Sequence, residues 1–93
     1  MTLSPITLRR WPRYSVDLPV QVMLHQGAEK LVVPGRGTEL SRGGMALYVG
    51  LALKPGDPIE VEFQTPSKIR VAGIVRNRLG YCFGLEFLNQ LPS

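Results

Sequence analysis

Three arginines near the N-terminus, Arg9, Arg10 and Arg13, lie within five residues of each other around Trp11 and Pro12. Each guanidinium offers a planar fork of donors that fits phosphate oxygens or the O6/N7 edge of guanine, and it can stack on a base. Trp11 either anchors the segment by burial or stacks on a ligand, and Pro12 disfavours helix at the residue before it. The cluster therefore predicts an anion clamp; the alternative is a solvated basic arm.

A second polar stretch, 39–44, reads ELSRGG. Glu39 and Ser41 are two residues apart, so on an extended chain they point to the same side. A carboxylate suits the N1–H and 2-amino donors of guanine, and the hydroxyl is presented beside it. Gly44 lacks a side chain, so either another strand or a flat ligand and the arginine segment can approach its backbone. The alternative is an ordinary turn before a strand.

Catalytic and metal-binding groups are sparse. The single histidine, His25, ends an expected strand and is interpreted as a surface residue, and the single cysteine, Cys82, has no obvious basic neighbour in sequence to activate it. A metal site needs clustered His, Cys or carboxylates, and no suitable spacing occurs. We therefore expect a protein that is not an enzyme, with no catalytic residue, no metal and no cofactor.

Composition indicates one small domain. The chain has 93 residues, of which 44% are hydrophobic, with a formal net charge of +4 and a pI of about 9.7. A basic protein suits an anionic partner, although +4 is also compatible with a role in solubility alone. One cysteine fits a reducing cytoplasm, no apolar run is long enough to span a bilayer, and no export signal is recognised. We expect a cytoplasmic protein.

Period-two alternation of apolar residues indicates strands, and Gly and Pro mark the turns between them. No window shows a sustained helical period. Six short strands at this spacing predict an all-β fold, a small six-stranded antiparallel barrel in which closure removes exposed edges. The expected strands are 14–24, 30–33 resuming near 38, 45–49, 58–63, 68–77 and 81–87.

Some finer expectations follow from the same pattern. The alternation in 14–24 places Met23 on the outward face. Residues 34–37, Pro-Gly-Arg-Gly, are expected to interrupt the second strand as a bulge or loop. Residues 78–80 are expected to turn the chain, and Tyr81 to face the core. In 68–77 one face is formed by Ile69, Val71 and Val75.

Taken together, the two polar clusters resemble the signature of the PilZ domain, a bacterial sensor of cyclic di-GMP. Arg9 and Arg13 match its R-x-x-x-R motif, and Ser41 and Gly44 match its [D/N]-x-S-x-x-G motif. Glu39 departs from the second motif, because it keeps the acceptor of Asp but extends it by a methylene. The late stretch VRNRLGYCFGLEF is similar to the closing hairpin of the family, so the resemblance covers nearly the whole chain.

The resemblance implies a PilZ-like barrel over 14–93 and a flexible N-terminal arm, 1–13, that clamps the ligand. It implies binding of cyclic di-GMP without chemistry, with the glycines clearing space for a purine and for the closing arm. It also implies second-messenger signalling to a separate downstream protein partner. The ligand-binding residues expected on this basis are Arg9, Arg10, Arg13, Glu39, Ser41, Arg42, Gly43 and Gly44.

Two alternatives remain open at this point. The first is a PilZ-like adaptor that binds only protein, with Glu39 as the sign of lost nucleotide binding. The second is a small basic barrel that binds single-stranded nucleic acid, which would require exposed aromatic residues on its strands. Tyr48 is the candidate, but most aromatic residues share the core parity, so nucleic acid is the less favoured partner.

Overall fold

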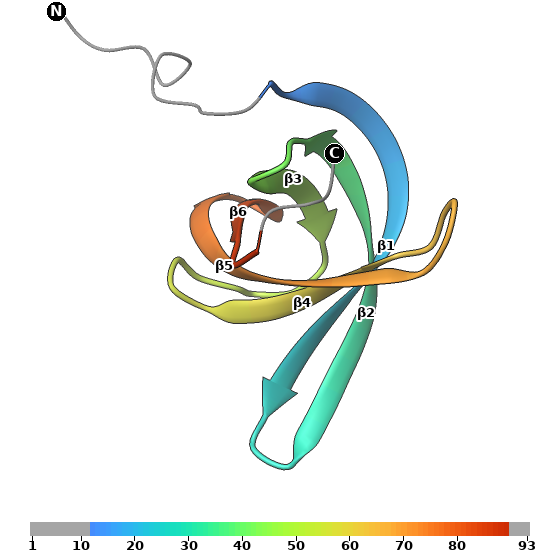
Figure 1. Cartoon of the computed structure of the whole chain (residues 1–93). Coiled ribbons are helices and arrows are strands. Elements are labelled where there is room, and N and C mark those ends of the chain that lie inside the picture. The colour runs from blue at the N-terminus through green and yellow to red at the C-terminus, as the bar shows by residue number, and fades with distance from the viewer. Residues whose placement is uncertain (1–11, 90–93) are drawn as a thin grey trace, which may run out of the picture.

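The computed structural model describes residues 12–89, so Arg9, Arg10, Trp11 and the rest of the expected arm up to residue 11 lie outside the described residues. Six antiparallel strands form one closed barrel in the order β1-β2-β3-β6-β5-β4 (Figure 1). The expected six-stranded antiparallel barrel is therefore confirmed. The strands are β1 (Tyr14–Gln26), β2 (Glu29–Leu40), β3 (Gly44–Val49), β4 (Pro58–Phe63), β5 (Ile69–Leu79) and β6 (Cys82–Phe87).

Alternation along the strands builds the core. In β4, Ile59, Val61 and Phe63 are at most 6% exposed, and the glutamates between them face outward, as expected. Burying each such side chain contributes about 1.5–3 kcal/mol. The core cluster contains Val20, Val22, Met45, Leu47, Val49, Leu53, Ile59, Val61, Phe63, Val75, Phe83, Leu85 and Phe87.

Strand β2 continues through residues 34–37, so the expected interruption there is wrong. Pro34 pairs with β1, and β3 joins β2 only from Gly35 onward, so no second strand needs the N–H that Pro34 lacks. The lack of a side chain at Gly35 lets β3 approach, because a Cβ there would lie 2.8 Å from the carbonyl oxygen of Tyr48. The irregularity occurs instead between Gly37 and Glu39, where the register with β3 shifts.

Strand β5 is longer than expected and includes Arg78 and Leu79. The turn falls on Gly80, whose φ is 64°, and on Tyr81. Tyr81 is 56% exposed, so the expectation that it faces the core is wrong: it belongs to the turn and not to β6. Arg78 is held in the strand by a hydrogen bond of 3.0 Å from its Nη1 to the carbonyl oxygen of Leu53.

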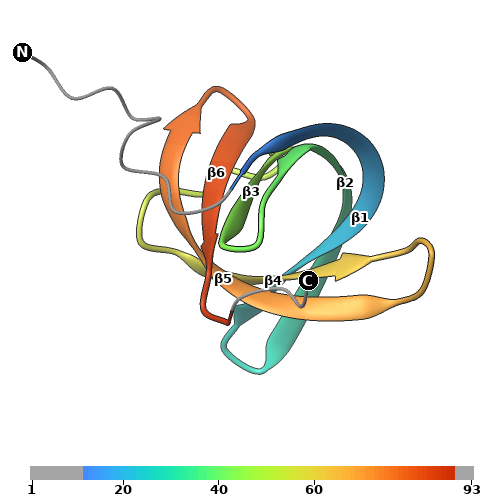
Figure 2. The same cartoon turned by 45° about the horizontal axis from the view of Figure 1, so that its top comes forward.

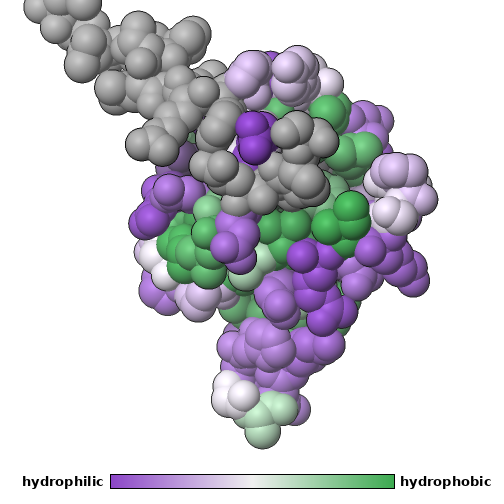
Figure 3. Space-filling model, in the orientation of Figure 1, coloured by the Kyte–Doolittle hydropathy of each residue, from purple (hydrophilic) through white to green (hydrophobic). Residues whose placement is uncertain are grey.

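The outward face of the barrel is not uniformly polar. Met23 was expected to face solvent, but it is only 3% exposed. The strand is flanked on both sides at this point, because Met23 pairs with Val32 of β2 and with Glu60 of β4. Hydrophobic residues also gather over the barrel in Figure 3, whereas the hairpin below them is mainly hydrophilic.

The hairpin of β1 and β2 projects beyond the rest of the barrel in both views (Figure 1 and Figure 2). Gly27, with φ of 63°, supplies the left-handed conformation that its tight turn requires. Within residues 12–89 the structure has no helix of the length and apolarity needed to cross a membrane.

Candidate ligand-binding site

A pocket of about 440 Å³ lies where the turn between β2 and β3 meets strands β5 and β6. Its volume falls in the range of roughly 300–1,000 Å³ that is typical of small-molecule sites. One side, the turn wall, consists of Ser41, Gly43 and Gly44. Another part of the lining, the bulge wall, consists of Arg76, Asn77, Gly84 and Glu86, and it adjoins the turn wall where Gly44 pairs with Glu86. The remaining lining residues are Arg13, Met45, Ala46, Cys82, Phe83 and Leu85.

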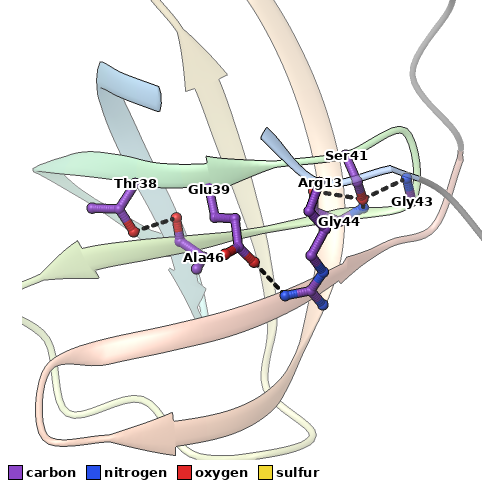
Figure 4. Close-up of polar contacts among 7 residues, drawn as sticks. All are labelled: Arg13, Thr38, Glu39, Ser41, Gly43, Gly44 and Ala46. Atoms are coloured by element: carbon purple, nitrogen blue, oxygen red, sulfur yellow. Dashed lines mark hydrogen bonds and ion pairs between the residues drawn. The ribbon is translucent and has the colours of Figure 1, made fainter. Parts of the chain in front are cut away.

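Ser41 shapes the turn wall through its hydroxyl. The Ser41 Oγ accepts hydrogen bonds of 3.2 Å from the backbone N–H groups of Gly43 and Gly44 (Figure 4). The Ser41 N–H and the Ser41 hydroxyl both donate to the Gly44 carbonyl oxygen, at 2.9 Å and 3.3 Å. Serine side chains often close turns in this way. The serine of the second motif therefore fixes the backbone of the turn.

Gly44 is approached closely by another strand. A Cβ on Gly44 would lie 2.2 Å from the carbonyl oxygen of Leu85 in β6, closer than real Cβ contacts come. The neighbouring Gly43 carbonyl oxygen also accepts a hydrogen bond of 2.8 Å from the Phe87 N–H. The structure thus supplies a reason for glycine at position 44 that is separate from the space expected for a ligand: β6 itself needs it.

Arg13 and Glu39 bring the two sequence motifs into contact. The Arg13 Nη1 forms an ion pair with the Glu39 carboxylate (Figure 4), and the two side chains are 42% and 36% exposed. Arg13 lines the pocket, whereas Glu39 and Arg42 are not among the described residues that line it. Arg9 and Arg10 lie outside the described residues. The structure therefore places four of the eight expected binding residues, Arg13, Ser41, Gly43 and Gly44, at one pocket.

The bulge wall was not identified from the sequence. The register between β5 and β6 shifts between Val75 and Asn77, so Arg76 is the extra residue of a β-bulge. Simple alternation from the buried Val75 would turn Asn77 inward, but Asn77 is exposed and lines the pocket. A bulge re-aims side chains in this way. It depends on the register between β5 and β6, which the alternation of residues along β5 alone does not reveal.

The charges of the bulge wall are paired. The Arg76 Nε donates a hydrogen bond of 2.6 Å to Glu86 Oε1, and both side chains are more than half exposed. The guanidinium of Arg76 is therefore held in place at the pocket by a partner that stays in water. Such an exposed pair contributes little to stability, about 0–1 kcal/mol, so its main effect is to orient Arg76.

His25 and Glu62 lie away from the pocket. His25 Nε2 is 3.2 Å from Glu60 Oε1 on the barrel surface, in agreement with its interpretation as a surface residue. A hydrogen bond from Gln64, and then the Arg70 guanidinium, hold the pKa of Glu62 below its usual value. In the part of the chain that the structure describes, no group of three His, Cys, Asp or Glu could hold a metal ion.

Comparisons with known proteins agree with the fold. The family model described as the PilZ domain matches residues 7–93. The structure is similar to that of the Bacillus subtilis inhibitor of motility, MotI/DgrA, with a TM-score of 0.69 and 21% sequence identity, and the match covers 89% of this chain and 44% of that chain. This chain thus spans less than half the length of MotI/DgrA.

Two solved PilZ domains are also similar in structure to this chain, each with a TM-score of 0.67. One is the PilZ domain of CeSA from a cellulose-synthesizing bacterium, with a TM-score of 0.67, 16% identity and coverage of 88% of this chain and 83% of that one. The other is the PilZ domain of Escherichia coli YcgR with c-di-GMP, with a TM-score of 0.67, 21% identity and coverage of 87% and 78%. A sequence comparison with curated proteins found no significant match.

Proposed function

Because the chain belongs to the PilZ domain family, a family of non-catalytic receptor domains, we propose that it binds the second messenger cyclic di-GMP. The observation that carries the proposal is the meeting of two motifs at one pocket, with Arg13 from the first and Ser41 and Gly44 from the second. The YcgR domain, which shares this fold, was solved with that nucleotide.

Each of these residues has a separate role in the proposal. Arg13 binds a phosphate or a guanine edge with its planar fork of donors. Ser41 and the two glycines shape the turn against which the ligand lies. Glu39 acts through its ion pair with Arg13, which holds the guanidinium at the pocket.

The N-terminal arm completes the site in the proposal. Residues 1–13 close over the ligand bound to the barrel of residues 14–93, and Arg9 and Arg10 add phosphate or base contacts from the arm. Arg42, which adjoins the turn wall in sequence, adds a further contact. Several arginines are needed because cyclic di-GMP carries two phosphates and two guanines, and one cation cannot engage all of them.

Ligand binding also gives the protein a place in signalling. Binding and arm closure change the surface that a downstream protein partner meets, which transmits the signal without any reaction. Cyclic di-GMP is a messenger of bacterial cells, so we place the protein in the cytoplasm.

Calorimetric titration with cyclic di-GMP, GMP and a single-stranded oligonucleotide at one salt concentration tests the proposal. We expect cyclic di-GMP to bind with a Kd on the order of 1 μM, which corresponds to about −8 kcal/mol, and GMP to bind far more weakly. Tyr48 is 55% exposed, so the oligonucleotide tests for base stacking on it. Absence of binding at about 100 μM cyclic di-GMP would remove the receptor function and favour a protein adaptor, whereas tighter binding of the oligonucleotide would favour a nucleic-acid protein.

A further inference from the structure

Asn77 occupies a position at the pocket that only the bulge creates. Val75 pairs with Leu85 and Asn77 pairs with Gly84, so the extra residue Arg76 reverses the alternation after Val75. The Asn77 side chain consequently lines the pocket. Bulges beside functional sites commonly serve to redirect one side chain.

The amide of Asn77 lies against the backbone of Gly84. A Cβ on Gly84 would lie 2.4 Å from Asn77 Oδ1 and 2.8 Å from Asn77 Nδ2. Both polar atoms of the amide therefore occupy the space that any other residue at position 84 would fill. Glycine at this position seats the amide at the pocket.

Within residues 12–89 no hydrogen bond joins the side-chain amide of Asn77 to another residue. An asparagine amide offers two N–H donors and one carbonyl acceptor. A guanine edge also combines donors and acceptors, whereas a phosphate presents acceptors only and is better matched by the guanidinium groups of Arg13 and Arg76. The chemistry of the amide thus fits a base.

Among the described residues, those of the second sequence motif offer no comparable free group for a base. The Glu39 carboxylate is bonded to Arg13 and does not line the pocket in the described part of the chain. The Ser41 hydroxyl is engaged by the turn. Among the polar side chains of the two walls, Asn77 is the one whose donors and acceptor all remain available.

We infer that Asn77, seated on Gly84 by the bulge at Arg76, binds a guanine base of cyclic di-GMP through its amide. This inference rests on the proposed function. It adds a base-contacting residue on β5, a strand that carries neither of the two sequence motifs.

Calorimetry with cyclic di-GMP on four variants tests the inference. Asn77→Ala and the nearly isosteric Asn77→Leu should each raise the Kd about 10-fold, the effect of one lost hydrogen bond. Gly84→Ala should raise it by a similar factor, because the new Cβ displaces the amide. Gly50→Ala is the matched glycine control, since its Cβ would meet nothing within 4 Å, and its Kd should stay within twofold of wild type.

A second measurement is made on the wild-type protein, so the binding site is not altered by any substitution. The side-chain NH₂ resonances of Asn77, assigned by their loss in Asn77→Ala, should shift when cyclic di-GMP saturates the wild-type protein. No binding by wild type would overturn the proposed function and this inference with it. Binding by wild type with unchanged affinity in both Asn77 variants, or with unshifted Asn77 resonances, would overturn this inference alone.

Discussion

The two walls of the pocket differ in where their polar groups form hydrogen bonds and in how their glycines are packed. The turn wall is closed on itself, because the Ser41 hydroxyl is bonded to backbone N–H groups and Gly44 is pressed against β6. The bulge wall presents polar side chains outward, with Arg76 oriented by Glu86 and Asn77 lying over Gly84. The wall with the family motif is thus mainly a shaped surface, and the wall without it carries the groups that can contact a ligand.

The largest effect should come from comparing one glycine on each wall. In Gly44→Ala the new Cβ would meet the carbonyl of Leu85, and backbone in a closed barrel cannot move away. We expect the free energy of unfolding to fall by about 1–3 kcal/mol, with the melting temperature lowered by roughly 4–8 °C per kcal/mol.

In Gly84→Ala the Cβ would meet the amide of Asn77, which can rotate. The free energy of unfolding should therefore change by only about 0.5 kcal/mol or less, although ligand binding weakens. Thermal melts of both variants check the contrast. Equal melting temperatures for the two variants would contradict a distinction between a structural glycine and one that seats a side chain.

Arg13, which lines the pocket outside the two walls, tests whether the first motif contributes a contact of its own. Arg13→Ala should weaken cyclic di-GMP binding by about 10- to 100-fold, because a charged hydrogen bond is worth about 1.5–3 kcal/mol. Arg13→Lys should restore only part of the loss, since an ammonium lacks the planar fork. Binding isotherms measure both.

Arg36→Ala is the matched control for Arg13, because Arg36 also forms an exposed ion pair, with Asp17 at 2.6 Å, but does not line the pocket. Its affinity should be close to that of wild type. Wild-type affinity in Arg13→Lys would mean that Arg13 acts only by general charge attraction.

Ser41→Ala should remove the group that closes the turn wall. The backbone N–H groups of Gly43 and Gly44 would lose the acceptor that now lies 3.2 Å from each, so we expect the free energy of unfolding to fall by about 1 kcal/mol and cyclic di-GMP affinity to fall a few-fold. Ser67→Ala, in an exposed bend outside the pocket, is the control. A large loss of affinity without any loss of stability would indicate that the hydroxyl contacts the ligand directly.

Glu39 should give the smallest effect. Exposed ion pairs are worth about 0.2–1 kcal/mol, so Glu39→Ala should weaken cyclic di-GMP binding only a few-fold through a less well oriented Arg13. Glu39→Asp restores the family residue and should bind as well as wild type or better. A double-mutant cycle with Arg13→Ala measures the coupling, and strictly additive losses would show that Glu39 acts independently of Arg13.

The sequence predicted features that depend on local alternation. Ile59, Val61 and Phe63 could be assigned to the core because every second residue of a half-buried strand shares a face. The interpretation was wrong where neighbouring strands determine the structure. Residues 34–37 were expected to interrupt a strand that in fact pairs with β1 through all four of them, and Tyr81 was expected in the core but belongs to a turn.

The candidate site shows the same difference between features that the local sequence determines and features that strand pairing determines. Arg13, Ser41 and Gly44 could be predicted because they stand in short motifs whose spacing is visible in the sequence. Asn77 could not, because its direction is set by a register shift against β6 and by the space left at Gly84. Both causes are pairings across the β5–β6 hairpin, and alternation along one strand does not determine the register of such pairings.

The pairing of β3 with β6 also has a consequence for how the protein folds. It joins Gly44 to Glu86 and Tyr48 to Cys82, with all of β4 and β5 in the loop between them. Closing so long a loop costs chain entropy before any contact is made, and such non-local pairings tend to slow folding. The two walls of the pocket stand on either side of this junction, so the pocket exists only in molecules that have completed it. If this junction closes after the rate-limiting step of folding, a ligand bound in the pocket leaves the folding rate unchanged and slows unfolding.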